Sequence, residues 1–317
     1  NGCSETVAVF IEQNSDILLS TSFTDVSCNG DNNGMIQLSG TGGVGNLSYS
    51  LDGMSSANGL FENLSAGDYL AVVTDEDNCS TSEIITITEP EDLTLTTAGT
   101  AMPDCFGEQN GSINALAAGG TGNYTYELNG VSNTTGQFDN LGAGNYTIQV
   151  TDANNCTEVL DVVLEQPMAI ISDVQSTTDV SCNGDANGAV SLSSNGGTGD
   201  FTYTLSGESN DTGLFNDLAS GSYTAVISDA NNCTSEINFS IEEPEAILLS
   251  LDEVTDVSCN GENDGMIMAE SSGGTGTITY TLGNETNTTG IFENLSVGTY
   301  QIMVEDANAC TTSIDAS

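Results

Sequence analysis

The sequence predicts an all-β protein, arranged as a tandem array of small β-sandwich modules. Three observations support this prediction: a repeat of constant length, apolar residues that alternate along short segments, and glycine-rich turns between those segments. The repeat length sets the size of one folding unit. Alternation is the period of a half-buried strand, whereas a helix would bring apolar residues back every three or four positions, and no segment shows that pattern.

The repeat is marked by the phrase Ser27-Cys28-Asn29-Gly30-Asp31, and close copies follow at intervals of 77 residues. The first cysteines of the repeats are Cys28, Cys105, Cys182 and Cys259, and a second cysteine follows each after 51 residues, at Cys79, Cys156, Cys233 and Cys310. This period divides the chain into the end of a preceding repeat (1–14), three repeats (15–90, 91–167 and 168–244) and a truncated fourth (245–317). We therefore expect the chain to be a piece of a longer protein.

The cysteines predict one disulfide inside each module. A unit of about 77 residues is near the lower limit at which an apolar core alone is sufficient, and closing a 51-residue loop removes about 4 kcal/mol of unfolded-chain entropy. We expect the pairs Cys28–Cys79, Cys105–Cys156, Cys182–Cys233 and Cys259–Cys310, with Cys3 left unpaired, although spacing alone does not prove connectivity. Disulfides indicate an oxidising, extracellular location.

The charge balance excludes several classes of function. The chain carries 46 Asp and Glu residues and no Lys, Arg or His. Nucleic acids and anionic membrane surfaces need cations to bind them, so neither is expected as a direct partner. Without Lys or His there is no Ser-His-Asp triad, no Schiff base and no His-ligated zinc site. An enzyme with paired carboxylates is disfavoured, because a repeat array does not form one deep cleft. We expect no enzymatic activity, no required cofactor and no direct membrane insertion.

Short strands are expected throughout each repeat. In the first they are predicted at Ile17–Phe23, Gly34–Ser39, Leu47–Leu51, a short segment near Leu60 and Phe61, Asp68–Thr74 and Glu83–Thr88. The turn Gly42-Gly43-Val44-Gly45 supplies the positive φ angles that a tight connection needs. A phosphate-binding loop is the alternative for such a turn, but it requires a Lys and a following helix. Six or seven strands in about 77 residues fit a small sandwich.

Two sets of tyrosines refine this prediction to an immunoglobulin-like sandwich. The phrase Leu64-Ser-Ala-Gly67-Asp-Tyr69 is typical of the corner at which a tyrosine hydroxyl bonds back to the backbone. The second set, Tyr49, Tyr126, Tyr203 and Tyr280, follows the buried alternation. These rings are expected to fill the core, because a carbohydrate-stacking platform, the alternative, needs exposed rings. Pro90, Pro167 and Pro244 end the repeats and predict short, semi-rigid connections between modules.

Five ordered elements of the repeat unit resemble the SprB repeat: Cys-Asn-Gly-Asp-x-Asn-Gly, Gly-Gly-Thr-Gly-x-x-x-Tyr-x-Leu, Phe-x-x-Leu-x-x-Gly-x-Tyr, Asp-Ala-Asn-x-Cys, and Glu-Pro or a near equivalent. The departures are small, with Phe106 in place of Asn, Val44 in place of Thr and Ala309 in place of Asn. The SprB family builds the very long cell-surface adhesin of gliding flavobacteria. The resemblance implies export by the type IX secretion system, attachment at the cell surface, and the secretion and gliding machinery as partners.

Two functional hypotheses follow. In the first, the repeats are a stalk whose partners are the neighbouring repeats, and which takes part in gliding motility and surface attachment. In the second, the repeats themselves bind glycans or surfaces weakly and gain strength through avidity, with surface polysaccharide as the candidate ligand. Variation between repeats at positions such as Gly53 to Gly59 and Gly130 to Gly136 argues against the second.

A calcium site is the remaining expectation. If Cys28 bonds to Cys79, the acidic turns that contain Asp31 and Asp75 converge, and oxygen ligands of this kind suit Ca²⁺. The candidate ligands in the four repeats are Asp31, Asp75, Glu108, Asp152, Asp185, Asp229, Glu262 and Asp306. The alternative, which the pattern favours, is that these side chains bond their own backbone in Asx turns.

Overall fold

The computed structural model describes residues 2–317, and all regular structure in that range is β-strand. The chain forms two compact units, one of residues up to Pro103 with Gly107–Gln166 and the other of Asp104–Phe106 with Pro167–Ser317. Among the described residues there is no helix of the length and apolarity needed to span a membrane. The all-β prediction is therefore confirmed.

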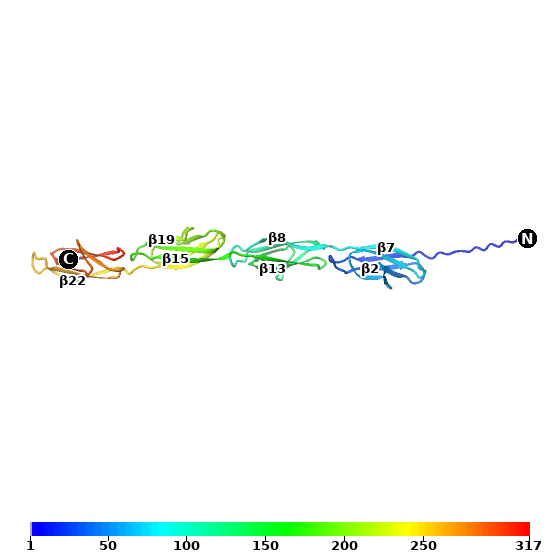
Figure 1. Ribbon diagram of the computed structural model, residues 1–317, viewed down its shortest axis with the longest axis horizontal. Helices are drawn as coiled ribbons and strands as arrows, with labels where there is room; N and C mark the ends of the chain where they lie inside the picture. Colours follow the sequence, from blue (N-terminus) through cyan, green and yellow to red (C-terminus); the bar gives the residue numbers. More distant parts are fainter. Residues whose placement is uncertain (1) are drawn as a thin grey trace. The chain divides into compact units, whose positions relative to one another are not determined.

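The first repeat folds into two antiparallel sheets (Figure 1). Its strands are β1 (Leu18–Thr24), β2 (Gly34–Thr41), β3 (Ser48–Leu51), β4 (Met54–Ser56), β5 (Leu60–Leu64), β6 (Gly67–Thr74) and β7 (Ser80–Ile87). One sheet has the order β1-β2-β5 and the other β4-β3-β6-β7. Two antiparallel sheets of seven strands in this order are the immunoglobulin-like arrangement that the sequence predicts. The short strand β4 was not predicted from the sequence.

The other repeats follow the same plan. The second contains β8 (Glu91–Ala101), β9 (Gly111–Gly120), β10 (Thr125–Leu128), β11 (Val131–Asn133), β12 (Gln137–Leu141), β13 (Gly144–Thr151) and β14 (Thr157–Leu164). The third contains β15 (Met168–Thr178), β16 (Gly188–Gly197), β17 (Thr202–Leu205), β18 (Glu208–Asn210), β19 (Leu214–Leu218), β20 (Gly221–Ser228) and β21 (Thr234–Ile241). The fourth contains β22 (Leu248–Thr255), β23 (Gly265–Ser272), β24 (Thr279–Leu282), β25 (Glu285–Asn287), β26 (Ile291–Leu295), β27 (Tyr300–Glu305) and β28 (Thr311–Ala316).

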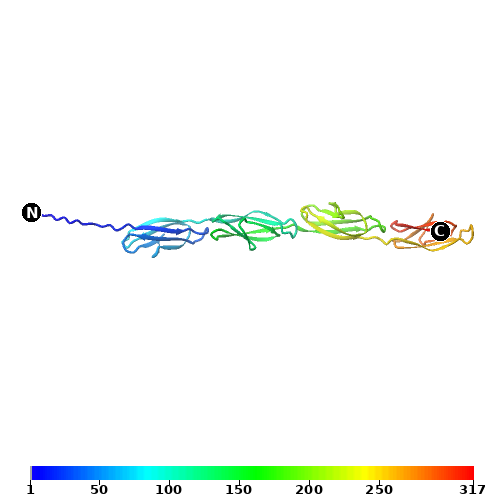
Figure 2. The same cartoon turned by 180° about the vertical axis from the view of Figure 1, so that it is seen from behind.

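Each repeat has its own apolar core between its two sheets. Figure 2 shows the strands of the four repeats from behind. In the first repeat Ile36 on β2 and Leu51 on β3 are fully buried, and the residues beside them in sequence are more exposed. This alternation is the strand period read from the sequence. The inner faces of the two sheets therefore form a separate core in each repeat.

One irregularity distinguishes the first strand of repeat 1 from its equivalents. In β8, β15 and β22 the pairing with the next strand shifts by one residue, between Thr97 and Gly99, Val174 and Ser176, and Leu251 and Glu253. The β1–β2 pairing runs without a shift. The first strand of repeat 1 thus lacks a bulged residue. Because this residue is missing, Cys3 precedes Cys79 by 76 residues, whereas the later second cysteines are 77 residues apart.

The tyrosine corner is confirmed in all four repeats. The hydroxyl of Tyr69 donates to the carbonyl of Ser65 at 2.9 Å, and Tyr146, Tyr223 and Tyr300 make the equivalent bond to Gly142, Ala219 and Ser296. Of the second set of tyrosines, Tyr126, Tyr203 and Tyr280 are buried and Tyr49 is half-buried against the core of repeat 1. These rings fill the cores, so they offer no exposed platform for a sugar.

Candidate functional site: the junction between repeats

The disulfides link neighbouring repeats, which corrects the predicted pairing inside each repeat. In the described part of the chain the bonds are Cys28–Cys156, Cys105–Cys233 and Cys182–Cys310, each across 128 residues. The first cysteine of one repeat is thus bonded to the second cysteine of the next. The Cα–Cα distances are 5.7, 5.5 and 5.6 Å, within the normal range for a disulfide. Cys3, Cys79 and Cys259 are unpaired and exposed.

The two cysteines of one repeat cannot meet because they lie at opposite ends of the sandwich. Cys28 follows strand β1 in the chain. It lies at the end of the module at which β6 begins, where Gly67 on β6 pairs with Ile87 on β7. Cys79 lies beyond the other end of β6, where Thr74 pairs with Ser80. An eight-residue strand separates these ends by roughly 26 Å at about 3.3 Å per residue. A disulfide tolerates no more than about 7 Å between Cα atoms, so only the next repeat brings a second cysteine within reach.

The loop that carries the first cysteine is tied to the linker of its own repeat. The amide N–H of Gly30 donates to Glu89 Oε2 at 2.7 Å, and Asn29 Nδ2 donates to the carbonyl of Pro90 at 3.0 Å. In the third repeat Gly184 bonds to Glu243 and Asn183 to Pro244 in the same way, and in the second Gly107 bonds to Gln166. The Glu-Pro linker is therefore held in place by side-chain and backbone bonds as well as by its proline.

The turn that carries the second cysteine is organised around a buried aspartate. Asp152 is 5% exposed, and its Oδ1 accepts from the backbone N–H groups of Asn154 at 2.9 Å and Cys156 at 2.8 Å. Its Oδ2 accepts from the N–H of Thr121 in the glycine-rich turn at 2.8 Å. Asp75, Asp229 and Asp306 have the same three kinds of donor. The carboxylate therefore joins two turns at the end of the module.

The glycine-rich turn needs its glycines for this contact. Gly120 has a φ of +58°, and a Cβ atom there would lie 2.7 Å from Oδ2 of Asp152. A side chain would therefore strain the backbone and collide with the carboxylate. The positive φ predicted for the equivalent Gly42, Gly43 and Gly45 is confirmed.

The carboxylate of Asp306 shows the electrostatic result of this arrangement. Burial by itself raises its pKa, but the N–H groups of Cys310, Thr275 and Asn308 stabilise the ionised form, and the net pKa is below the ordinary value. The charged carboxylate is thus the form that holds the two turns together.

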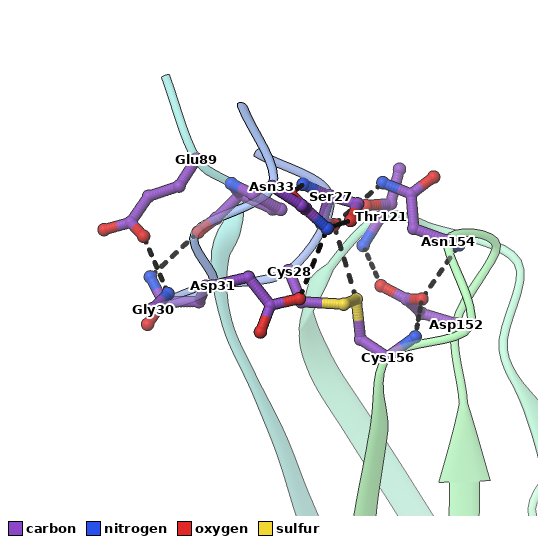
Figure 3. Close-up of a disulfide and its surroundings, with 12 residues drawn as sticks. Ser27, Cys28, Gly30, Asp31, Asn33, Glu89, Thr121, Asp152, Asn154 and Cys156 are labelled. Carbon is purple, nitrogen blue, oxygen red and sulfur yellow. Dashed lines mark hydrogen bonds between the residues drawn. A yellow bond between two sulfur atoms is a disulfide. The ribbon is translucent and has the colours of Figure 1, made fainter. Parts of the chain in front are cut away.

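An asparagine completes the junction across the repeat boundary. Asn154 Nδ2 donates to the backbone carbonyl of Ser27 at 2.9 Å, beside the Cys28–Cys156 bond (Figure 3). Asn231 donates to Asp104 and Asn308 to Ser181 in the same way, both at 3.0 Å. The junction therefore consists of a cysteine loop and its linker from one repeat, and an aspartate turn from the next, joined by a disulfide and a hydrogen bond.

The predicted calcium ligands occupy two different places in this geometry. Asp75, Asp152, Asp229 and Asp306 are buried and accept backbone N–H groups, as the Asx-turn alternative describes, whereas Asp31, Glu108, Asp185 and Glu262 are exposed on the cysteine loops. The convergence of Asp31 with Asp75 depended on a Cys28–Cys79 bond, which does not form. Within residues 2–317 no three His, Cys, Asp or Glu side chains are grouped so that they could hold a metal ion.

Sequence reasoning missed the residues that make the junction specific. The same position of the repeat is occupied by Asn154, Asn231 and Asn308, whereas repeat 1 has Asp77 there. The asparagines could have indicated a hydrogen bond that needs a side-chain N–H donor. Asn29 and Asn183 likewise recur beside the first cysteine. Neither pattern identifies its partner without the structure, because the partners lie 61 or 127 residues away.

Comparison with known proteins identifies the repeat. The family model described as "SprB repeat" matches residues 20–56, 102–133, 174–210 and 251–287, once in each of the four repeats. A search of curated proteins found no match.

Several solved structures are similar in fold. Invasin, a bacterial integrin-binding protein, is 11% identical to this chain, with a TM-score of 0.34. The match covers 94% of this chain and 78% of the invasin chain. The three N-terminal domains of the bacteriophage RB49 outer capsid protein Hoc are 14% identical and cover 73% of this chain and 100% of their own, with a TM-score of 0.33. The C-terminal fragment of intimin is 19% identical over 51% of this chain and 67% of its own, with a TM-score of 0.30. Likenesses of this size assign no ligand or partner.

Proposed function

Because the chain is built from four tandem SprB repeats, we propose that it is a tension-carrying stalk segment of a secreted cell-surface adhesin. The observation that supports this most directly is the offset of the disulfides by one repeat. Disulfides inside a module would only brace that module. Disulfides between modules give the chain a covalent path that bypasses most of its residues.

The path runs from Cys28 across its disulfide to Cys156, along the backbone to Cys182, and across the next disulfide to Cys310. The backbone between Cys156 and Cys182 consists mainly of β14, with eight residues, and β15, with eleven. Both are strands, so each of them is itself already close to its full length. Tension applied along the chain is then resisted by covalent bonds with little slack to release.

A second path runs beside the first. It follows β7 and β8 from Cys79 to Cys105, crosses to Cys233 and continues along β21 and β22 to Cys259. In the first path the segment between the two disulfides joins the last strand of one repeat to the first strand of the next, and in the second path the segments on either side of the disulfide do the same. The cores therefore need not withstand the full tension themselves.

This mechanical property suits a long adhesin of a gliding bacterium. The SprB repeats and the disulfides indicate an extracellular protein. We propose further that the parent protein is exported by the type IX system, is attached to the cell surface and takes part in gliding motility. In this role the repeats are non-enzymatic, transmit force between the cell and a distal adhesive part, and are kept apart from one another by the charge of −46.

Single-molecule force spectroscopy on the full chain, held by its termini, tests this proposal. With disulfides intact, the shortest covalent path allows an extension of only about 220 Å, whereas the reduced chain extends to about 1,100 Å. The reduced chain should also release steps of about 250 Å as single repeats unfold. An oxidised chain that extends as far as the reduced one would contradict the proposal.

Two double variants provide matched controls. Cys105→Ser with Cys233→Ser removes one disulfide but leaves the shortest path intact, so the maximum extension should stay at about 220 Å. Cys28→Ser with Cys156→Ser removes a disulfide from that path, and the maximum should rise to roughly 570 Å. Equal extension of the two variants would show that the disulfides do not define the tension path.

A further inference from the structure

We propose that Met102 is a modification site, and that its oxidation to the sulfoxide by hydrogen peroxide restores a hydrogen bond to the linker of repeat 2. This linker begins at Glu165, directly after β14, and leads to Pro167. The side chain of Met102 is 56% exposed, so a small oxidant has access to its thioether sulfur. Repeats 1 and 3 show what a polar oxygen does at the position of Met102.

In repeats 1 and 3 this position is occupied by aspartate. Asp25 Oδ1 accepts from the backbone N–H of Thr88 at 2.7 Å, and Asp179 Oδ1 accepts from the backbone N–H of Glu242 at 2.8 Å. In both repeats the donor is the first residue after the last strand. The aspartate oxygen therefore holds the start of the linker against the cysteine loop, and Glu165 is the corresponding donor in repeat 2.

The linker of repeat 2 has lost other bonds in the same place. The N–H of Val26 donates to the linker of repeat 1 at 3.0 Å, whereas its equivalent Pro103 has no N–H. Asn29 donates to the carbonyl of the linker proline, whereas the side chain of its equivalent Phe106 has no donor. With the aspartate oxygen also missing, three of the four bonds that hold the linker of repeat 1 cannot form in repeat 2. One restored bond is therefore a large part of what holds this linker.

Oxidation gives Met102 the oxygen that its thioether lacks. The sulfur lone pair attacks one oxygen of hydrogen peroxide, the O–O bond breaks, and proton transfer leaves the sulfoxide and water. Methionine loses two electrons and the peroxide gains them, so the step balances. The sulfoxide oxygen stands one bond further from Cα than Oδ1 of an aspartate, and the unbranched side chain is flexible. It is therefore long enough to bring this oxygen to the N–H of Glu165.

The direction of the expected effect is unusual for methionine. Oxidation of a buried methionine disrupts its core, because the sulfoxide is polar. Met102 is exposed and is not one of the residues that form the core of repeat 2. Oxidation therefore costs no apolar packing, and the new acceptor tightens the linker. The change is reversible, since sulfoxide reductases return the thioether.

The test treats the full chain with hydrogen peroxide after the exposed thiols of Cys3, Cys79 and Cys259 have been alkylated. A peptide map measures the fraction of sulfoxide at Met102, and hydrogen exchange measures the exchange rate of the Glu165 amide. We expect this rate to fall about fivefold once Met102 is oxidised. The amides of the equivalent Thr88 and Glu242 are internal controls, and their exchange rates should not change.

Two variants separate the sulfoxide from other effects of peroxide. Met102→Leu keeps an apolar side chain of similar size that peroxide does not oxidise. In this variant exchange at Glu165 should not respond to peroxide, although other exposed methionines, such as Met168 at 74%, are still oxidised. Met102→Asp carries the residue of repeats 1 and 3, and it should slow exchange at Glu165 without peroxide.

The proposal is overturned if Met102 stays unoxidised while Met168 is converted, or if exchange at Glu165 is unchanged or faster once the sulfoxide has formed. Slower exchange in Met102→Leu after peroxide would overturn it too, because another residue would then be the cause. Fast exchange at Glu165 in Met102→Asp would show that this position does not hold the linker, and the proposal would again fail.

Discussion

Asn154 reaches across the repeat boundary and donates from Nδ2 to the carbonyl of Ser27, 127 residues earlier in the chain. The bond lies beside the disulfide between Cys28 and Cys156 and fixes the turn of one repeat against the loop of the other. A residue that the sequence presents as part of an acidic turn is therefore a structural part of the junction.

Asn154→Asp should weaken the first junction. The substitution removes the donor and places a carboxylate against a carbonyl oxygen, so the junction opens more often and its disulfide becomes accessible to reductant. We expect the Cys28–Cys156 bond to be reduced about fivefold faster by dithiothreitol. The Cys182–Cys310 bond of the same molecule is the internal control. An unchanged ratio of the two rates would show that the asparagine bond contributes nothing.

Asp306→Asn should destabilise repeat 4 by about 1–3 kcal/mol at pH 7, because an amide cannot accept all three backbone donors. The folded-state pKa of Asp306 is lowered, so its stabilisation is fully present above the unfolded pKa of about 3.9 and is lost as the pH falls through the folded value. The difference between wild type and variant should therefore shrink below about pH 4. Hydrogen exchange of the β27 and β28 amides measures the stability of repeat 4 in both proteins. A stability difference that does not depend on pH would contradict the stabilising role of the Asp306 carboxylate.

Ala309→Asn should stabilise repeat 4. Ala309 has a φ of +62°, and the equivalent residues Asn78, Asn155 and Asn232 have φ values between +62° and +67°. Asparagine tolerates this left-handed conformation, whereas alanine is penalised by roughly 1 kcal/mol. Exchange protection in β28 should rise by a corresponding amount. The reverse substitution, Asn232→Ala, should lower protection in β21. Protection that falls in Ala309→Asn, or that rises in Asn232→Ala, would rule out this explanation.

Calcium should leave the melting temperature unchanged. The oxygens of Asp75 and its equivalents accept backbone N–H groups, and the disulfide that was expected to bring Asp31 to Asp75 does not form. The measurement compares thermal melts in millimolar Ca²⁺ and in excess chelator. A melting temperature that rises with Ca²⁺ and falls with chelator would restore the calcium hypothesis.

Much of the fold was predictable because its signals are local. The alternation of Tyr146, Ile148 and Val150 marks a strand within a few residues, and the corner phrase ending in Tyr69 encodes a bond that spans four. The turn at Gly42 and Gly43 is determined by backbone sterics alone. Signals of this kind do not depend on neighbouring repeats.

The disulfide pairing was not predictable from the same signals, for two reasons. In a tandem repeat the spacings of 51 and 128 residues are equally constant, so regular spacing does not distinguish a partner in the same repeat from one in the next. The predicted strands also omitted β4 (Met54–Ser56). Five strands, β2 to β6, separate Cys28 from Cys79, and an odd number of passes leaves the two cysteines at opposite ends of the module. Four passes would have brought them to the same end.

A peptide map of the oxidised chain without reduction tests the central claim most directly. The free thiols at Cys3, Cys79 and Cys259 are alkylated at acidic pH before digestion to prevent exchange, and a protease that cuts at Asp and Glu is used because trypsin has no site. We predict linked peptides that join Cys28 to Cys156, Cys105 to Cys233 and Cys182 to Cys310. Peptides that join Cys28 to Cys79 or Cys105 to Cys156 would contradict both the junction and the tension path.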